Sequence, residues 1–296
     1  MYIINFIRGF CMALADSVPG VSGGTIAFIL GFYDKFINSL SNVISGKKEE
    51  KIEAAKFLFK LGIGWIVGFV SSVLFLTSIF DKEIYKISSL FIGFIIFSIP
   101  IIIKEEKNSI INRYKNIFFA LVGIFIVVLL TYFNPVSNAE NAVGMSLDKL
   151  TLGLGAYIFI VAMVAISAMV LPGISGSTLL LIFGLYAPIM NAVKEVLKLN
   201  FDYLLVCIVF GFGVLFGIMI TIKGVKYLLS NYRSQTIYLI LGLMIGSIYA
   251  VFMGPTSLEV PKPPMDLHTF NIMFFVIGGG IILLLQKLKD YLENKN

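Results

Sequence analysis

Charged side chains are scarce in this chain. Asp, Glu, Lys and Arg make up 14% of its 296 residues, whereas hydrophobic residues make up 58%. The mean hydropathy is +0.94, a value that a soluble domain of this length does not sustain. The composition therefore excludes a soluble domain and predicts a polytopic membrane protein. The net charge of +6 does not indicate nucleic acid, because the basic residues stand in short loops between apolar runs.

Histidine and cysteine, which often bind metals or act in catalysis, are also rare. The chain has one His and two Cys, and Cys11 and Cys207 lie in apolar stretches without metal spacing or a redox pair. No apolar segment holds a His or an acidic pair that would activate water as a general base. We therefore expect no metal, no cofactor and no enzymatic activity.

The most informative motif is a tract that occurs twice, 153 residues apart. It reads VPGVSGGT at residues 18–25 and LPGISGST at residues 171–178, and Gly31 matches Gly184 at the same offset. The chain is therefore a duplicated structure. In both copies Pro and Gly interrupt apolar sequence, and irregular backbone persists in a bilayer only where protein buries it or where it lines a cavity. Paired breaks in two repeats indicate a transporter binding site.

Ten apolar segments, five per half, predict an all-α polytopic membrane protein. We interpret the first two segments of each half as a re-entrant helical hairpin, followed by three transmembrane helices; the alternative is ten full crossings. Residues 1–140 form the first repeat and residues 141–296 the second. The first repeat comprises a hairpin at 2–44 and helices at 57–80, 87–103 and 116–133; the second comprises a hairpin at 151–193 and helices at 203–222, 236–253 and 270–286.

Each interpretation gives an odd number of crossings per repeat, so the second half has an inverted topology. The loops expected inside hold fourteen Lys and Arg residues and those expected outside hold six, which predicts that both termini are cytoplasmic. The glycines at 64 and 68 match those at 213 and 217, and this four-residue spacing predicts close helix packing.

The two tracts form the predicted substrate site. Backbone N–H groups at a helix N-terminus favour an anion, and hydroxyl groups add bonds to phosphate oxygens. Two such tips facing each other near the membrane midplane would form an anion cradle; the alternative is that Ser and Thr merely cap the helices that follow. The expected binding residues are Pro19, Gly20, Ser22, Gly23, Gly24 and Thr25 in the first tract, and Pro172, Gly173, Ser175, Gly176, Ser177 and Thr178 in the second.

Ionisable residues inside apolar segments are the other candidates, because charge in a bilayer is costly and usually functional. Arg8 and Lys60 either bind the phosphate or extend to the cytoplasmic face. Asp16 stands directly before the first tract, where it carries a proton, holds Arg8, or caps a helix or turn. Lys223 and Lys226 are interpreted as positively charged anchors at the inner end of a helix.

The sequence ADSVPGVSGGT at residues 15–25, GFYD at 31–34 and LPGISGS at 171–177 resemble the bacterial polyprenyl-phosphate transporters of the PopT type, formerly a domain of unknown function. The resemblance covers essentially the whole chain. It implies a flippase of the bacterial plasma membrane that returns undecaprenyl phosphate, the lipid carrier of peptidoglycan precursors, from the outer to the inner leaflet. The expected partners are that lipid or a related polyprenyl phosphate, membrane lipids and, for coupling through Asp16, protons.

Two other functions are weighed against this one. A small-anion transporter or channel would use the same helix N-termini. An undecaprenyl-diphosphate phosphatase fits less well, because that enzyme family has an Arg in its Pro-Gly-x-Ser-Arg-Ser box where this chain has Gly23 and Gly176.

Overall fold

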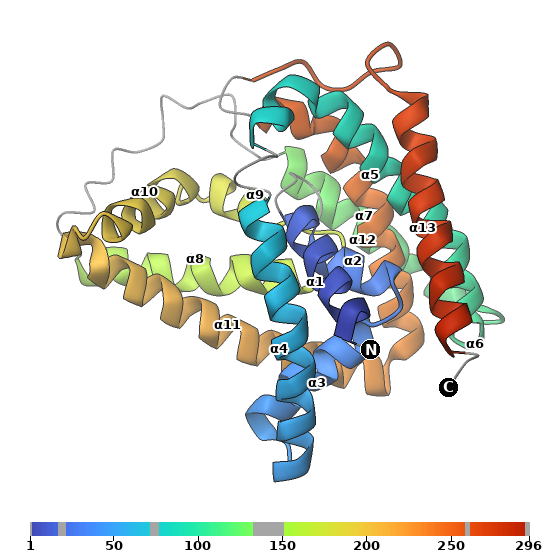
Figure 1. Ribbon diagram of the computed structural model, residues 1–296, viewed down its shortest axis with the longest axis horizontal. Helices are drawn as coiled ribbons and strands as arrows, with labels where there is room; N and C mark the ends of the chain where they lie inside the picture. Colours follow the sequence, from blue (N-terminus) through green and yellow to red (C-terminus); the bar gives the residue numbers. More distant parts are fainter. Residues whose placement is uncertain (1, 17–21, 72–76, 133–150, 258–260, 294–296) are drawn as a thin grey trace.

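The computed structural model is built from α-helices, and no β-strand occurs in the residues that it describes (Figure 1). It describes residues 2–16, 22–71, 77–132, 151–257 and 261–293. The helices of the first half are α1 (Tyr2–Asp16), α2 (Gly23–Ile29), α3 (Tyr33–Ser45), α4 (Lys48–Ser71), α5 (Thr77–Glu105), α6 (Lys107–Ile110) and α7 (Ile117–Tyr132). Those of the second half are α8 (Leu152–Val170), α9 (Gly176–Ile182), α10 (Tyr186–Leu197), α11 (Leu204–Asn231), α12 (Arg233–Met253) and α13 (Ile272–Glu293).

Within the described residues, six stretches are long and apolar enough to cross a membrane, so the chain is a multi-pass membrane protein. They are Lys48–Ser71, Glu83–Glu105, Tyr114–Tyr132, Leu152–Val170, Phe201–Asn231 and Arg233–Thr256. A shorter apolar stretch, Ile272–Leu284, lies within α13. By this measure α8 is long enough to span, although the sequence places it in a re-entrant hairpin; α1, which carries Arg8 and Asp16, is not among the six.

Several helix boundaries differ from the predicted ones. α4 begins at Lys48 rather than at 57, because the Lys, Glu and Ala residues before the apolar stretch are strong helix formers. α11 continues to Asn231 instead of ending at 222, because Val225 and Leu229 extend its buried face for two further turns beyond Ile222. The predicted helix at 57–80 also ends too late, because α4 ends at Ser71 and α5 begins at Thr77.

The second segment of each predicted hairpin is broken into two helices by a glycine. α2 ends two residues before Gly31, which has φ of 66°, and α9 ends two residues before Gly184, which has φ of 65°. The N–H of the next residue donates to a carbonyl five positions earlier in both copies, from Phe32 to Ala27 (3.0 Å) and from Leu185 to Leu180 (2.8 Å). This is the helix-ending motif that a left-handed glycine permits. The duplication seen in the sequence therefore extends to backbone conformation.

Matched glycines hold one long helix against the first helix of each half. Gly64 and Gly68 of α4 lie against Phe6 and Phe10 of α1. In the second half, Gly213 and Gly217 of α11 lie against Phe159 and Met163 of α8. A Cβ atom at Gly217 would stand 2.6 Å from the Met163 carbonyl oxygen, so these crossings exclude any side chain. The predicted close packing is confirmed at these four glycines.

The remaining long helices pair across the two halves. Gly242 and Gly246 of α12 lie against Ala120 and Ile124 of α7, and Gly93 and Phe97 of α5 lie against Phe275 and Gly279 of α13. In all four helix pairs the contacts advance one turn in the same direction on both helices, so each pair runs parallel, as the ribbon also shows (Figure 1).

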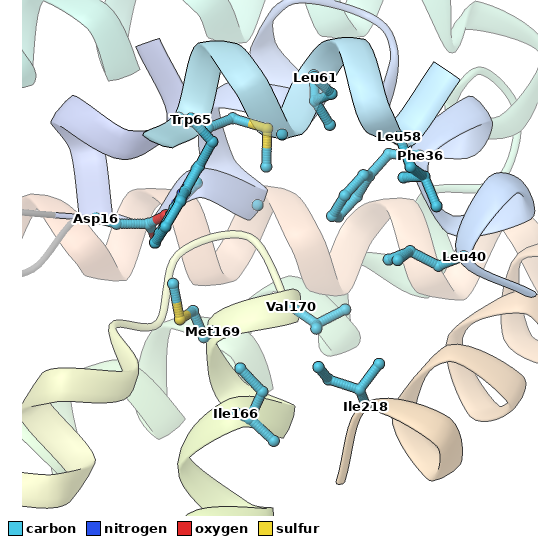
Figure 2. A pocket seen from close by; sticks show the side chains of 14 residues that line it. Asp16, Phe36, Leu40, Leu58, Leu61, Trp65, Ile166, Met169, Val170 and Ile218 are labelled. Carbon is cyan, nitrogen blue, oxygen red and sulfur yellow. The ribbon is translucent and has the colours of Figure 1, made fainter. Parts of the chain in front are cut away.

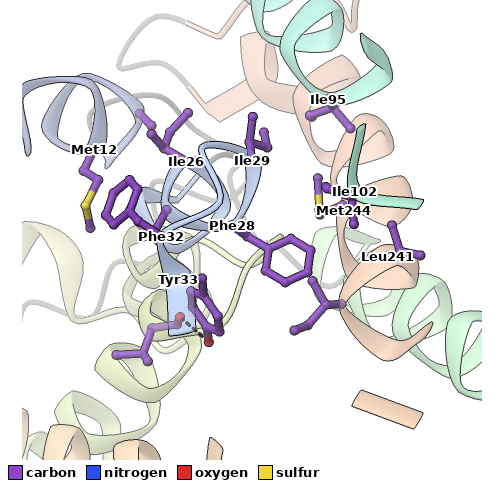
Figure 3. Close-up of a cluster of buried hydrophobic side chains, with 14 of the residues drawn as sticks. Met12, Ile26, Phe28, Ile29, Phe32, Tyr33, Ile95, Ile102, Leu241 and Met244 are labelled. Carbon is purple, nitrogen blue, oxygen red and sulfur yellow. Dashed lines mark hydrogen bonds between the residues drawn. The ribbon is translucent and has the colours of Figure 1, made fainter. Parts of the chain in front are cut away.

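A continuous buried cluster joins the first hairpin to helices of both halves (Figure 3). Phe28 and Tyr33, at the end of α2 and the start of α3, pack in the same cluster as Ile95 of α5 and Met244 of α12, and all four are at most 8% exposed. The short helix α2 is therefore fixed by packing with both halves, because a helix of seven residues is marginal by itself.

Candidate functional site

The first tract begins α2 with a serine cap. Ser22 has extended backbone, and its Oγ accepts a hydrogen bond from the Thr25 N–H at 3.3 Å. The Ser22 and Thr25 hydroxyl oxygens lie 3.1 Å apart, and both residues are 1% exposed. Ser22 thus takes the capping role weighed as the alternative to phosphate binding. Pro19 and Gly20 fall outside the described residues.

Asp16 occupies the N-terminus of α2. Its carboxylate accepts hydrogen bonds from the Gly23 N–H at 2.6 Å and from the indole N–H of Trp65 on α4 at 3.0 Å. A Cβ atom at Gly23 would stand 2.8 Å from the carboxylate, so only glycine leaves room for this contact. The Asp16 carboxylate therefore accepts a hydrogen bond from the N–H group that we predicted to bind a phosphate.

The two tracts lie against each other, as the duplication predicts. The Gly173 N–H donates to the Thr25 Oγ1 at 2.8 Å, and the Ser22 hydroxyl donates to the Leu171 carbonyl at 3.3 Å. The Tyr33 hydroxyl adds a bond to the Val170 carbonyl at 3.1 Å. Polar groups of the first hairpin thus satisfy backbone groups exposed where α8 ends, which is how irregular backbone is tolerated at membrane depth.

The hydroxyl groups of the second tract face another part of the molecule. The Ser175 and Ser177 hydroxyl oxygens lie 2.7 Å apart, and Ser175 borders a cavity of only about 10 Å³ with Gly173 and Val127. Pro172 and Gly176 are buried, and Gly176 lies against Ala165 of α8. Thr178 lies in the first turn of α9. The site residues predicted in the two tracts therefore meet at Ser22, Thr25 and Gly173, while Ser175 and Ser177 bond to each other.

The two predicted cationic site residues, one on α1 and one on α4, each contact an aromatic ring. The Arg8 guanidinium lies 4.7 Å from the centroid of the Phe32 ring and donates to the Asn5 side chain at 3.4 Å. The Lys60 ammonium lies 3.5 Å from the centroid of the Tyr2 ring. These are cation–π contacts.

An apolar cavity of about 330 Å³ separates the first hairpin and α4 from α8 and α11 (Figure 2). Asp16 is the one ionisable residue in its lining, and Trp65 lies beside it at the same end. Phe36, Leu40, Leu58 and Ile218 surround the other end, and the remaining lining residues are Met12, Gly23, Gly24, Leu61, Gly62, Ile166, Met169 and Val170. The cavity is thus bounded by helices of both halves and meets the first tract at Gly23 and Gly24.

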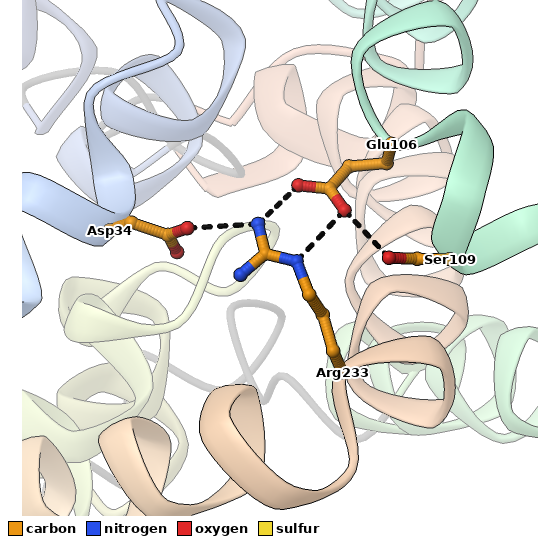
Figure 4. A network of polar contacts seen from close by, with 4 residues as sticks. All are labelled: Asp34, Glu106, Ser109 and Arg233. Carbon is orange, nitrogen blue, oxygen red and sulfur yellow. Dashed lines mark hydrogen bonds and ion pairs between the residues drawn. The ribbon is translucent and has the colours of Figure 1, made fainter.

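Three charged residues far apart in the sequence meet at the start of α12 (Figure 4). The Arg233 guanidinium forms an ion pair with Asp34 of α3 at 2.8 Å and two bonds with Glu106, which stands between α5 and α6 and also accepts from Ser109. From the sequence, Arg233 is predicted only to be one of the basic residues of an inner loop. No short-range sequence pattern could have predicted these ion pairs, because Asp34 and Arg233 are 199 positions apart.

The family comparison covers both tracts and the entire cavity lining. Residues 12–268 match the family model described as "VCA0040-like: Undecaprenyl phosphate translocase-like". The chain belongs to this family. The resemblance stated from the sequence is therefore confirmed.

Two proteins that are similar to this chain over most of its length have the same name. A Staphylococcus aureus protein named polyprenyl-phosphate transporter is 35% identical over 286 residues, which cover 96% of each chain. A Vibrio cholerae protein with the same name is 29% identical over 268 residues, which cover 87% of this chain and 80% of the relative. No solved structure matches the chain significantly.

Proposed function

We propose that this protein moves undecaprenyl phosphate from the outer to the inner leaflet of the bacterial plasma membrane without changing the lipid chemically. The observation that carries the proposal is the apolar cavity between the two halves, in a chain whose relatives are named polyprenyl-phosphate transporters. An apolar lining suits a prenyl chain, whereas a channel for small anions needs polar groups along its path.

The parallel helix pairs support an inverted repeat, and the Lys and Arg residues of the loops support both termini in the cytoplasm. If α4, α5 and α7 cross in turn and the second half is inverted, α7 runs in the same direction as α12, and α5 in the same direction as α13. Without inversion both pairs would be antiparallel. The contacts of Gly242 with Ala120 and of Gly246 with Ile124 fit the inverted arrangement. On this proposal α1 and α8 each enter the membrane and end at the two tracts.

In this mechanism the contact between the two tracts is the gate. The bonds from Gly173 to Thr25 and from Ser22 to Leu171 close the hairpins against each other. Rocking of one repeat relative to the other would separate them. The freed Gly173 N–H and Ser22 hydroxyl would then donate to phosphate oxygens, with Arg8 and Lys60 attracting the head group from the cytoplasmic end.

Coupling to protons would use Asp16. A phosphate dianion moving inward opposes an inside-negative potential by about 2.3 kcal/mol per charge per 100 mV. Asp16 borders the cavity and contacts the first tract through Gly23, so a proton on its carboxylate would weaken its hold on α2. Proton entry together with the lipid would offset the electrical cost.

The test is flipping of labelled undecaprenyl phosphate in vesicles that contain the purified full chain. We expect transport by the intact protein, acceleration by a pH gradient, and a loss of at least tenfold in Ser22→Ala with Thr25→Val. Asp16→Asn should retain transport without responding to the gradient, and excess inorganic phosphate should not compete. Failure of the folded intact protein to move the lipid would overturn the proposal, and unaltered gradient dependence in Asp16→Asn would remove Asp16 from the coupling step.

A further inference from the structure

A lysine lies close to the end of the apolar cavity opposite Asp16. The Lys226 ammonium on α11 donates to the buried Ser41 hydroxyl on α3 at 3.3 Å. Leu40, the neighbour of Ser41, lines the cavity, and so does Ile218 on α11. Ile218 and Lys226 are eight positions apart on the helix, so the same face of α11 leads from the cavity to the lysine over about 12 Å.

The charge of Lys226 is not neutralised by a carboxylate. Its hydrogen-bond partner is a neutral hydroxyl, and within the described part of the chain it forms no ion pair. The residue is half-buried, at a contact between the two halves. A lysine that served only as an anchor at the membrane surface would have no need of this position.

The two ends of the cavity therefore differ in charge. Asp16 stands at one end, and Lys226 with the Ser41 hydroxyl lies beyond the other. An elongated ligand with one anionic end would be repelled by the carboxylate and attracted by the ammonium, because both interactions are strong in an apolar setting. The volume of about 330 Å³ is at the lower limit for ligand sites, so it accommodates only part of a long chain.

We propose that Lys226 and Ser41 bind the phosphate of the prenyl phosphate while its first isoprene units occupy the cavity between Leu40 and Trp65. This inference rests on the proposed function and assigns its inward-facing binding site, a role that the sequence does not give to Lys226. The rest of the prenyl chain leaves the cavity and stays in the bilayer.

The chain carries its own probe for this site. Trp65 is the single tryptophan, it lines the cavity, and its ring stacks on Phe69 with centroids 5.1 Å apart. The experiment titrates the detergent-solubilised full chain with farnesyl phosphate, farnesol or inorganic phosphate and records Trp65 fluorescence. We expect saturable changes with farnesyl phosphate, weaker ones with farnesol, and none with inorganic phosphate.

Variants separate the phosphate contact from the cavity. Lys226→Gln should weaken farnesyl phosphate binding about tenfold, the cost of one charge-assisted hydrogen bond, and leave farnesol binding unchanged, whereas Lys226→Arg should restore it. Lys223→Gln, an exposed lysine one turn earlier, is the matched control. Gly62→Leu should abolish binding of both ligands, because Gly62 lines the cavity and a Cβ there meets no atom within 4 Å. Its counterpart Gly211→Leu, equally open but outside the cavity lining, should bind as the intact protein does.

Equal farnesyl phosphate affinity in Lys226→Gln and the intact protein would overturn the inference even if vesicles transport the lipid. Binding that depends on Lys226 and Gly62 in a protein that fails to transport would keep the site and overturn the proposed function. A response to inorganic phosphate as strong as that to farnesyl phosphate would also overturn the inference, because it would show a site for free anions.

Discussion

At the scale of single residues, Asp16 connects three elements through two hydrogen bonds. Asp16 is the last residue of α1. Its carboxylate accepts one hydrogen bond from the N–H of Gly23, the first residue of α2, and another from the indole N–H of Trp65 on α4. Hydrogen bonds to a charged group contribute about 1.5–3 kcal/mol each when partly buried. We predict that Asp16→Ala and Trp65→Phe each lower the thermal stability, and that the double variant loses clearly less than the sum of the two, because both remove the same contact. Thermal unfolding followed by circular dichroism in detergent measures this cycle; additive losses would mean that the bond contributes nothing.

The ion pairs of Arg233 support a second prediction for single residues. Glu106 is 17% exposed and bonds to Arg233 twice, whereas Asp34 is 46% exposed and bonds once. Because solvent screens the more exposed partner, we expect Glu106→Gln to cost about 1–2 kcal/mol of unfolding free energy and Asp34→Asn less than about 1 kcal/mol. Chemical denaturation of both variants compares the losses, and the opposite ranking would contradict the assignment.

The contacts between the two tracts follow from the sequence, and so does the cap that Asp16 forms at the start of α2, which is one of the two roles weighed for it. The bond of Asp16 to Trp65 and the ion pairs of Arg233 do not follow from the sequence. The repeated motif marks both tracts by itself, and two broken segments in a bilayer must bury their backbone against each other. Trp65 and Arg233 have no such marker. The first is one aromatic residue in an apolar helix, and the second is one basic residue in a basic loop, so their partners become visible only when helices far apart in the sequence are packed.

At the scale of helices, the glycines of α4 and α11 divide into two functional groups. Gly64 and Gly213 allow backbone contact with α1 and α8, whereas Gly62 and Gly211 face open space. We predict that Gly64→Ala and Gly213→Ala each cost about 1–3 kcal/mol through overpacking. The same substitution at Gly62 or Gly211 should instead raise stability by about 0.5–1 kcal/mol, because Gly in a helix interior is less favourable than Ala and a Cβ there meets no atom. Thermal unfolding of the four variants tests this pattern, and equal losses at all four positions would contradict it.

Helix existence is easier to predict than helix ends for a physical reason. The long apolar stretches of the sequence predict α4, α5, α7, α11 and α12, because a membrane crossing needs about 20 apolar residues. The ends depend on water-exposed turns, where Lys and Glu continue α4 back to Lys48 without any apolar signal. The break inside the hairpin depends on Gly31 adopting positive φ, a conformation that a glycine permits but does not require.

At the scale of the whole molecule, an inverted repeat places corresponding loops on opposite sides of the membrane. Lys47, just before α4, and Asn200, four residues before α11, lie in corresponding loops of the two halves. We predict that in a variant without native cysteines, Asn200→Cys reacts with a membrane-impermeant thiol reagent in intact cells, whereas Lys47→Cys reacts only after permeabilisation. Arg113→Cys should behave like Lys47→Cys, because the two crossings of α4 and α5 return the chain to the inner side before the loop between α5 and α7. Labelling of Lys47→Cys and Asn200→Cys from the same side would mean that the halves are not inverted. The parallel pairing of α7 with α12 would then require another explanation, and transport by rocking of opposed repeats would lose its structural basis.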